Sequence, residues 1–182
     1  MRKKILLLLS LFIGLLLLTG LPAQAEIAFD EDSEAAEAVA SLSEREIKGI
    51  FAAAEAGLPE AQLALGVLYL EGHQHLPKNT EKAVKWFKTA ADNNSVEAAA
   101  LLGALYVSGE ELEENFDQAC VYLEIAARKG HPASQYLYAM LCAFGLGREA
   151  DIDEARIWMN ASAENGDPDA QEFLRDNPEW IK

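Results

Sequence analysis

The sequence predicts an all-α protein built as a solenoid of antiparallel helical hairpins, and three observations lead to this fold class. Two blocks of sequence alternate along the chain, and each recurs at an offset of 36 or 37 residues. Small and apolar residues recur within each block at three- and four-residue spacing, which is the periodicity of an α-helix. Signals for helix starts and ends stand at matching places in the copies. Together these patterns predict three two-helix repeats stacked in series.

The first block predicts the first helix of each repeat. Its copies cover residues 61–72, 98–109 and 134–145. The sixth position of the block is small in every copy, being Gly66, Gly103 or Ala139. A larger side chain there would hold the two helices of a hairpin apart, so we expect close helix packing at this position.

The second block predicts the second helix of each repeat. Its copies cover residues 83–91, 119–127 and 155–163, and the fourth position is aromatic, as Trp86, Tyr122 and Trp158. We expect these rings to fill the space between one hairpin and the next. Because a single hairpin cannot bury its apolar face alone, the stack of repeats must supply the core.

Residues typical of helix starts precede the second block. Candidate N-caps stand there as Asn79, Asn115 and Asp151. Glu154 follows Asp151 by three residues, which is a capping-box pattern. Ahead of the repeats, Ser43 and Glu46 form the same pattern and predict a helix that runs to about residue 56.

Residues typical of helix ends follow the second helices. A position that favours a left-handed backbone comes after each one, and it is filled by Gly57, Asn94, Gly130 and Gly166. Proline then stands just inside the next helix, where its missing N–H costs nothing, at Pro59, Pro132 and Pro168.

The first 25 residues predict a secretory signal peptide. Three basic residues at 2–4 precede an apolar run from 5 to 18, and Ala23-x-Ala25 places the cut before Glu26. The alternative is an uncleaved membrane anchor, although the run is short against the roughly 20 residues of a bilayer span. We therefore expect an exported protein, periplasmic in a bacterium with two membranes and otherwise secreted, with no membrane insertion after cleavage.

The predicted organisation of the chain follows from these signals. It comprises a signal peptide (1–25), an acidic tail or frayed helix (26–42), a leading half-repeat (43–58), three repeats (59–95, 96–131 and 132–167) and a C-terminal cap (168–182). After cleavage the chain keeps 30 acidic and 12 basic residues. This charge disfavours nucleic acid and anionic lipid as partners, and it favours a basic partner surface.

The repeats resemble the Sel1-like repeat, a relative of the tetratricopeptide repeat. That family's pattern runs Ala-x3-Leu-Gly-x2-Tyr-x2-Gly, then a loop ending in Asp or Asn, then Ala-x2-Trp-Tyr and a closing Ala-Ala-x2-Gly. The match covers about residues 45–175, and it departs from the pattern at Ala139, Cys142 and Asn94. The resemblance implies a right-handed α-solenoid, and a non-enzymatic adaptor or regulator of partner proteins in the bacterial cell envelope.

The resemblance to tetratricopeptide arrays also implies where a partner would bind. First helices line the concave face of such arrays, which places eight residues in a partner-binding groove: Leu63, Val67, Leu70, Ala100, Ala104, Val107, Tyr136 and Met140. This stripe is apolar and would hold a helix or an extended peptide of another protein. The alternative is that tight superhelical curvature buries the same residues as ordinary core.

Both cysteines lie in the repeats. Cys120 and Cys142 are each eleven residues from His131, at the turn between two antiparallel helices, so they face one another at the same height. Because exported proteins mature in an oxidising compartment, we expect a structural disulfide between them. The alternative is two small, buried free cysteines.

Other chemistry has little support in the sequence. His73 and His75 have the spacing of metal ligands but lack an evident third ligand, and the glutamates at 110, 111, 113 and 114 lack the pattern of a calcium loop. No catalytic motif is present, so we expect no enzyme activity, no metal and no cofactor. The alternative to a protein-binding adaptor is a binder of envelope polysaccharide or of its synthesis machinery. Exposed aromatic residues on the concave face would favour that alternative, and only Tyr136 qualifies.

Overall fold

The computed structural model describes residues 41–181, which form eight α-helices, one 3₁₀ turn and two compact units. Unit 1 ends at Asn93 and unit 2 begins at Asn94. The predicted signal peptide and the acidic segment up to residue 40 lie outside the described residues. Among the helices that are described, none is long and apolar enough to cross a membrane.

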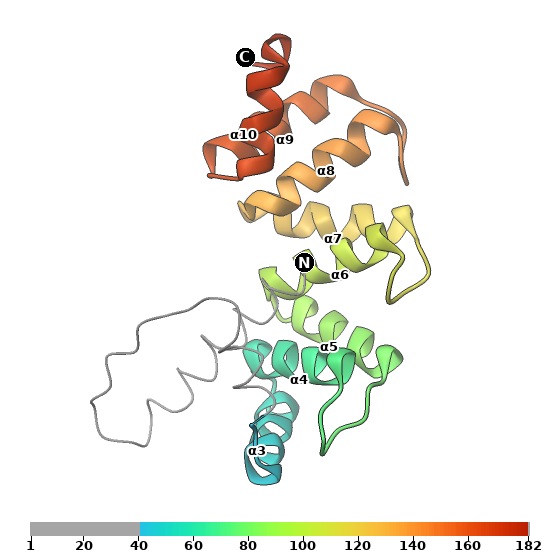
Figure 1. The fold of residues 1–182 in the computed structure, drawn as a ribbon, viewed down its shortest axis with the longest axis vertical. Helices are drawn as coiled ribbons and strands as arrows, with labels where there is room; N and C mark the ends of the chain where they lie inside the picture. Colours follow the sequence, from blue (N-terminus) through green and yellow to red (C-terminus); the bar gives the residue numbers. More distant parts are fainter. Residues whose placement is uncertain (1–40, 182) are drawn as a thin grey trace, which may run out of the picture. The chain divides into compact units, whose positions relative to one another are not determined.

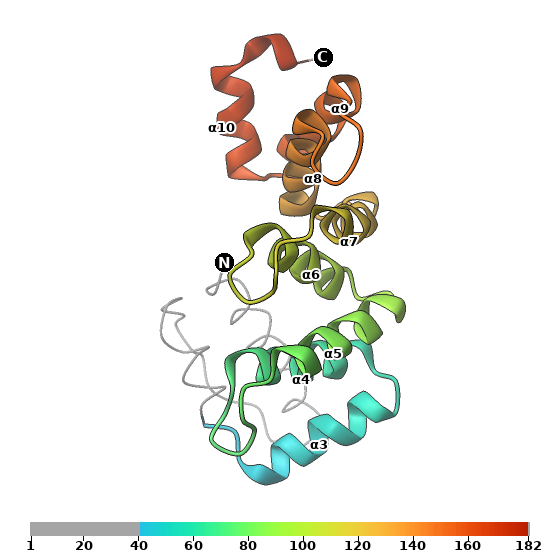
Figure 2. The same ribbon diagram turned by 90° about the vertical axis from the view of Figure 1, so that its right-hand side faces the viewer.

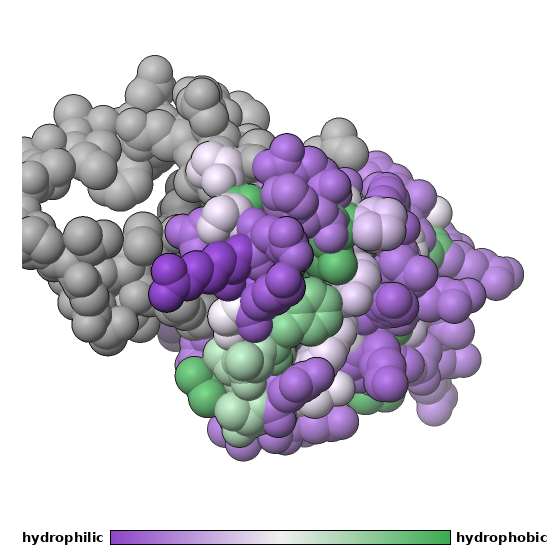
Figure 3. All heavy atoms as spheres, turned by 90° about the horizontal axis from the view of Figure 1, so that it is seen from below, coloured by the Kyte–Doolittle hydropathy of each residue, from purple (hydrophilic) through white to green (hydrophobic). Residues whose placement is uncertain are grey.

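Unit 1 contains three described helices (Figure 1). They are α3 (Glu44–Glu55), α4 (Pro59–Glu71) and α5 (Thr80–Asp92), and α4 packs against both of the others. Figure 3 views the molecule from the end where α3 lies, and polar side chains cover most of the described surface on that face. Apolar side chains form a smaller patch between them, as is normal for a solvated outer surface.

Unit 2 contains five helices and a short terminal turn (Figures 1 and 2). They are α6 (Val96–Ser108), α7 (Phe116–Arg128), α8 (Pro132–Phe144), α9 (Ile152–Glu164), α10 (Pro168–Asp176) and the 3₁₀ turn Pro178–Trp180. Within the unit, each helix from α7 to α10 packs against the one before it, and α6 also touches α8. The first helices of two successive repeats therefore lie side by side in this unit.

The predicted starts of the helices are confirmed. The side chains of Asn79, Asn115 and Asp151 each accept a hydrogen bond from the backbone N–H three residues later, at 2.9 Å in all three cases. At the start of α3, Ser43 and Glu46 form both halves of the capping box. The Asp151 box is only half formed, because the Glu154 carboxylate instead accepts hydrogen bonds from Arg148 and Trp158.

The predicted helix ends are confirmed as well. All four closing positions have a left-handed φ between 70° and 91°: Gly57, Asn94, Gly130 and Gly166. Among the described residues other than glycine, Asn94 is the one with a positive φ. Asparagine tolerates this backbone better than most residues do, so the departure from glycine leaves the turn intact.

Close packing at the small position of the first helices is confirmed. A Cβ atom added to Gly66 would lie 2.4 Å from Phe87 Cε1, and one added to Gly103 would lie 2.5 Å from Leu123 Cγ. In the third repeat, Ala139 belongs to a core cluster with Met159. Three equivalent side chains of the second helices thus fill the space over the small position, and Phe87, Leu123 and Met159 are all fully buried.

The aromatic position of the second helices lies at the edge of the core. Trp86, Tyr122 and Trp158 are only partly buried, and the residue that follows each of them occupies the core. Tyr122 stacks on Tyr106 with ring centroids 6.2 Å apart, and Trp158 meets Tyr138 edge-on at 5.7 Å. Tyr122 and Trp158 therefore pack against an aromatic side chain of their own hairpin. The space over the small residue of the first helix is filled by the residue that follows the aromatic position.

Candidate partner-binding surface

The first helices of the two repeats in unit 2, α6 and α8, contain almost no charged residues. Helix α8 has no charged residue, and Glu97 is the one charged residue of α6. A helix that is apolar all round is normally buried in the core. Tyr136, Met140 and Ala143 on α8 nevertheless stay only partly buried, so part of their apolar surface remains accessible.

The groove residues predicted from the sequence fall into two groups. Val67 and Leu70 in unit 1 are 2% exposed, and Ala100 and Ala104 in unit 2 are 8% exposed, so these four are core positions in the structure. A partner has accessible surface to contact at the partly buried members, which are Leu63, Val107, Tyr136 and Met140. Three of the four lie in unit 2.

The apolar surface of α8, formed by Tyr136, Met140 and Ala143, contacts α10 through Tyr136. Its ring packs with Met140 against a core cluster of Ala139, Met159, Ala170 and Leu174. Burial raises the pKa of the Tyr136 hydroxyl, and the carboxylates of Asp169 and Asp167 raise it further. The hydroxyl therefore lies near two acidic side chains at the start of α10, so one end of the apolar surface is negatively charged.

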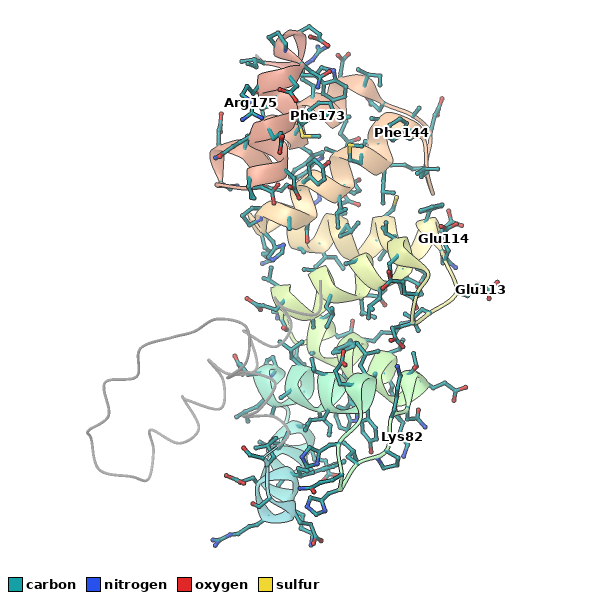
Figure 4. All side chains as sticks on the ribbon, viewed as in Figure 1. Lys82, Glu113, Glu114, Phe144, Phe173 and Arg175 are labelled. Atoms are coloured by element: carbon teal, nitrogen blue, oxygen red, sulfur yellow. The ribbon has the colours of Figure 1, made fainter. Side chains whose placement is uncertain are left out.

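The loop between α6 and α7 supplies charge near the C-terminal ends of α6 and α8. Gly109 ends α6 in a left-handed conformation, and Asn115 N–H donates to Tyr106 O at 3.0 Å, which closes the loop onto the helix. Glu113 and Glu114 in this loop are exposed. Figure 4 shows these glutamates at the same edge of unit 2 as Phe144, whose exposed fraction is 66%.

The two cysteines are free thiols in the structure and belong to one core cluster. Cys120 Sγ donates to Leu146 O at 3.2 Å. Burial raises the pKa of Cys120, and burial raises that of Cys142 to about 11. Burial thus favours the protonated form of both thiols. The predicted disulfide is not formed in this structure and stays a prediction.

A polar network beside the cysteines ties the α8–α9 loop to both helices. Arg148 donates to the Tyr138 hydroxyl and, at 2.5 Å, to Glu154 Oε2, while Trp158 Nε1 donates to Glu154 Oε1 at 3.2 Å. The Arg148 guanidinium also lies over the Tyr138 ring, 5.4 Å from its centroid. No pattern in the sequence predicted this network, which connects the loop to α8 and α9 by side-chain hydrogen bonds.

The histidine pair does not form a metal centre with other residues. The rings of His73 and His75 have centroids 5.5 Å apart, and His73 Nδ1 accepts a hydrogen bond from the His75 backbone at 3.2 Å. That bond occupies one of the ring nitrogens that would bind an ion. Within residues 41–181, no group of three or more histidine, cysteine, aspartate or glutamate side chains is placed to hold a metal.

Comparisons with known proteins agree on one type of repeat. The Sel1 repeat model matches residues 59–95, 96–131 and 132–167. The crystal structure of a Sel1 repeat protein from Oxalobacter formigenes superposes with a TM-score of 0.66 and 29% identity, covering 72% of this chain and 98% of that one. The structure of c5321, a protective antigen of uropathogenic Escherichia coli with an SLR fold, gives a TM-score of 0.65 and 29% identity over 69% of this chain and 27% of the antigen.

A curated relative is similar over a shorter stretch. The rat protein called DAP3-binding cell death enhancer 1 is 38% identical over 86 residues, which are 47% of this chain. The chain spans only 16% of that relative's length. The repeats, the helical hairpins and the matching solved structures give the same answer for fold and family: the chain belongs to the Sel1 repeat family and has its α-solenoid fold, which generally serves protein–protein interaction.

Proposed function

We propose that the chain is a non-enzymatic adaptor or regulator of the bacterial cell envelope, which binds a segment of another protein along the inner faces of its first helices. The observation that carries this proposal is the accessible apolar surface of Tyr136 and Met140 on α8, a helix without charged residues. An exposed apolar surface on a helical repeat is suited to a partner helix or an extended peptide.

Residues on several elements support the same surface. Val107, near the end of α6, is partly buried, as are Tyr136 and Met140 on the neighbouring α8. The position in the envelope is supported by the signal-peptide pattern of residues 1–25.

The experiment is to cross-link the tagged protein in cells and to identify the captured proteins by mass spectrometry. We expect one dominant protein partner, captured through the α8 surface. Tyr136→Glu and Met140→Glu place a charge on that surface, so each should reduce capture strongly, since burying an unpaired charge in an apolar interface is costly. Thermal unfolding of the purified variants checks that they remain folded.

A matched control is available on α9, the second helix of the third repeat. Ile157 on α9 is 49% exposed, and Ile157→Glu makes the same chemical change away from the proposed surface. Capture should survive this change. Equal loss with Ile157→Glu and Tyr136→Glu would contradict the proposed location, and enrichment of glycan without a protein partner would favour a polysaccharide binder.

A further inference from the structure

Unit 2 carries most of the negative charge of the described chain. Between residues 94 and 182 there are 17 acidic and 6 basic residues, whereas residues 41–93 contain 7 acidic and 6 basic residues. An imbalance of this size within one compact unit sets up a field that attracts cationic segments. The location of the uncompensated carboxylates then decides where such a segment would bind.

The arginines of unit 2 are engaged with carboxylates of their own. Arg128 pairs with Glu124 at 2.6 Å, and Arg148 pairs with Glu154 at 2.5 Å. Arg156 pairs with Asp153 at 3.6 Å, and Arg175 pairs with Glu172 at 3.2 Å and with Asp176 at 3.4 Å. These pairs compensate acidic residues on α7, on α9 and in the second half of α10, so the surplus negative charge lies elsewhere in the unit.

Part of the surplus lies at the two ends of the apolar surface on α8. At the N-terminal end, Asp169 on the first turn of α10 is exposed, and it precedes Ala170, a member of the core cluster against which Tyr136 packs. On the side of the C-terminal ends of α6 and α8, Glu113 and Glu114 are exposed in the loop that follows α6 (Figure 4). An apolar strip bounded by carboxylates at both ends thus runs along the helix.

The length of α8 sets the spacing between the two acidic ends. The helix has 13 residues, so it is about 20 Å long at the rise of an α-helix. An extended peptide covers that distance with about six residues. We propose that the partner segment is an apolar stretch of about this length with lysine or arginine on both sides, bound so that its cations meet Asp169 at one end and Glu113 and Glu114 at the other.

This inference rests on the proposed adaptor function, because it specifies the partner of the same surface. The test pans a library of random peptides displayed on phage against the full chain at low salt, and then measures the selected peptides by fluorescence anisotropy. We expect selected sequences with basic residues on both sides of an apolar core. Their affinity should fall about tenfold or more when the salt is raised to about 0.3 M, because salt screens exposed charges.

Two substitutions with the same change of charge separate site-specific attraction from general attraction. Asp169→Lys changes the second residue of α10, and Asp153→Lys changes the second residue of α9, which is 92% exposed. Asp169→Lys, alone or with Glu113→Lys, should weaken binding of the basic peptides about tenfold. Asp153→Lys should leave their affinity nearly unchanged. Equal weakening by Asp153→Lys and Asp169→Lys would overturn the proposed site.

The remaining outcomes distinguish this inference from the adaptor proposal. Peptides that lose affinity with Tyr136→Glu, or with the milder Tyr136→Ser, but show no basic preference would overturn the charge requirement and leave the adaptor surface standing. Basic peptides that are insensitive to both Tyr136 variants would move the binding site away from α8. A selection that enriches no peptide over background would count against both proposals.

Discussion

The side chain of Gln135 links the ends of three helices of unit 2, and its partner across the hairpin is Asn165. Gln135 Nε2 donates to Ala127 O at 3.1 Å, at the end of α7, while its Oε1 accepts from Asn165 Nδ2 at 2.9 Å, after the end of α9. The same arrangement occurs in unit 1 around Gln62, which donates to Ala54 O at 3.1 Å and accepts from Asn93 at 2.8 Å. Each glutamine thus gives a second hydrogen bond to a carbonyl near a helix end, which also accepts one from the backbone N–H three residues later.

We predict that Gln135→Leu destabilises the fold by about 1–3 kcal/mol, because it removes the two hydrogen bonds that the buried Gln135 side chain makes to Ala127 O and with Asn165. The free energy of unfolding in urea measures the effect. Gln171 supplies a control, since it donates to Ala163 O at 3.0 Å in the same way but is exposed. Gln171→Leu should change stability by no more than about 0.5 kcal/mol. Similar costs at both positions would mean that burial does not set the effect.

Two helical glycines should respond to alanine in opposite directions. Gly103→Ala would place a Cβ 2.5 Å from Leu123 Cγ and 3.0 Å from Leu123 N, so we expect a cost of about 1–3 kcal/mol from overpacking. Gly49 in α3 has no atom within 4 Å of an added Cβ. Gly49→Ala should therefore stabilise by about 0.5–1 kcal/mol through helix propensity. Urea unfolding measures the change in the free energy of unfolding for each variant. A change of the same sign in both would contradict the packing described for Gly103.

Removing the guanidinium of Arg148 should loosen the α8–α9 loop. Arg148→Met deletes the hydrogen bonds to Tyr138 and Glu154 while keeping an apolar stem, and we expect a loss of about 1–3 kcal/mol. Arg148→Lys keeps the charge but cannot make both bonds in the planar geometry of a guanidinium, so it should restore only part of the loss. Thermal unfolding compares the variants, and full rescue by lysine would mean that charge alone is needed.

The reduced protein should lose stability as the pH rises through the range where buried thiols ionise. The folded pKa of Cys142 is about 11, above its ordinary value of 9.0, because burial disfavours the thiolate. The unfolded chain therefore releases its proton first, so this contribution to stability is complete below pH 9 and is lost between about pH 9 and 11. Cys142→Ala should flatten that part of the curve of unfolding free energy against pH. An unchanged curve would show that Cys142 titrates normally in the folded protein.

The exported protein should have lost residues 1–25. We expect N-terminal sequencing of the protein from the envelope fraction to begin at Glu26. The same sample tests the disulfide. If Cys120 and Cys142 are joined in the oxidising compartment, thiol titration of the denatured, unreduced protein finds no free thiol. Two free thiols would refute the disulfide, and a start at residue 1 would favour the uncleaved anchor.

Local features of the helices could be predicted from the sequence because they depend on residues close in the chain. A cap such as Asn79 bonds a backbone N–H three residues away, and a left-handed turn such as Gly130 depends on its own backbone. Repetition then made the pairing of helices predictable, since copies related by 36 or 37 residues must pack alike. These interactions need no knowledge of distant parts of the chain.

Contacts between distant residues could not be predicted with the same accuracy. The sequence marks both Trp86 and Phe87 as large and apolar, and only the rotation of α5 against Gly66 buries Phe87 and leaves Trp86 at the edge. Arg148 likewise finds Tyr138 and Glu154 through the path of a loop whose sequence has no evident signature. A shift of one position around a helix changes its direction by about 100°, so side-chain periodicity alone leaves such choices open.

Local bonding and internal repetition are written in the sequence, so the series of helical hairpins, their caps and the type of repeat all follow from the sequence alone. The division of the apolar residues of the first helices into core positions and accessible positions follows from the way the helices pack together. Val67 and Met140 occupy equivalent positions of the first and third repeats, yet Val67 is 2% exposed and Met140 keeps part of its surface accessible. Burial depends on what packs over a residue from elsewhere in the chain, and that is settled when the helices assemble.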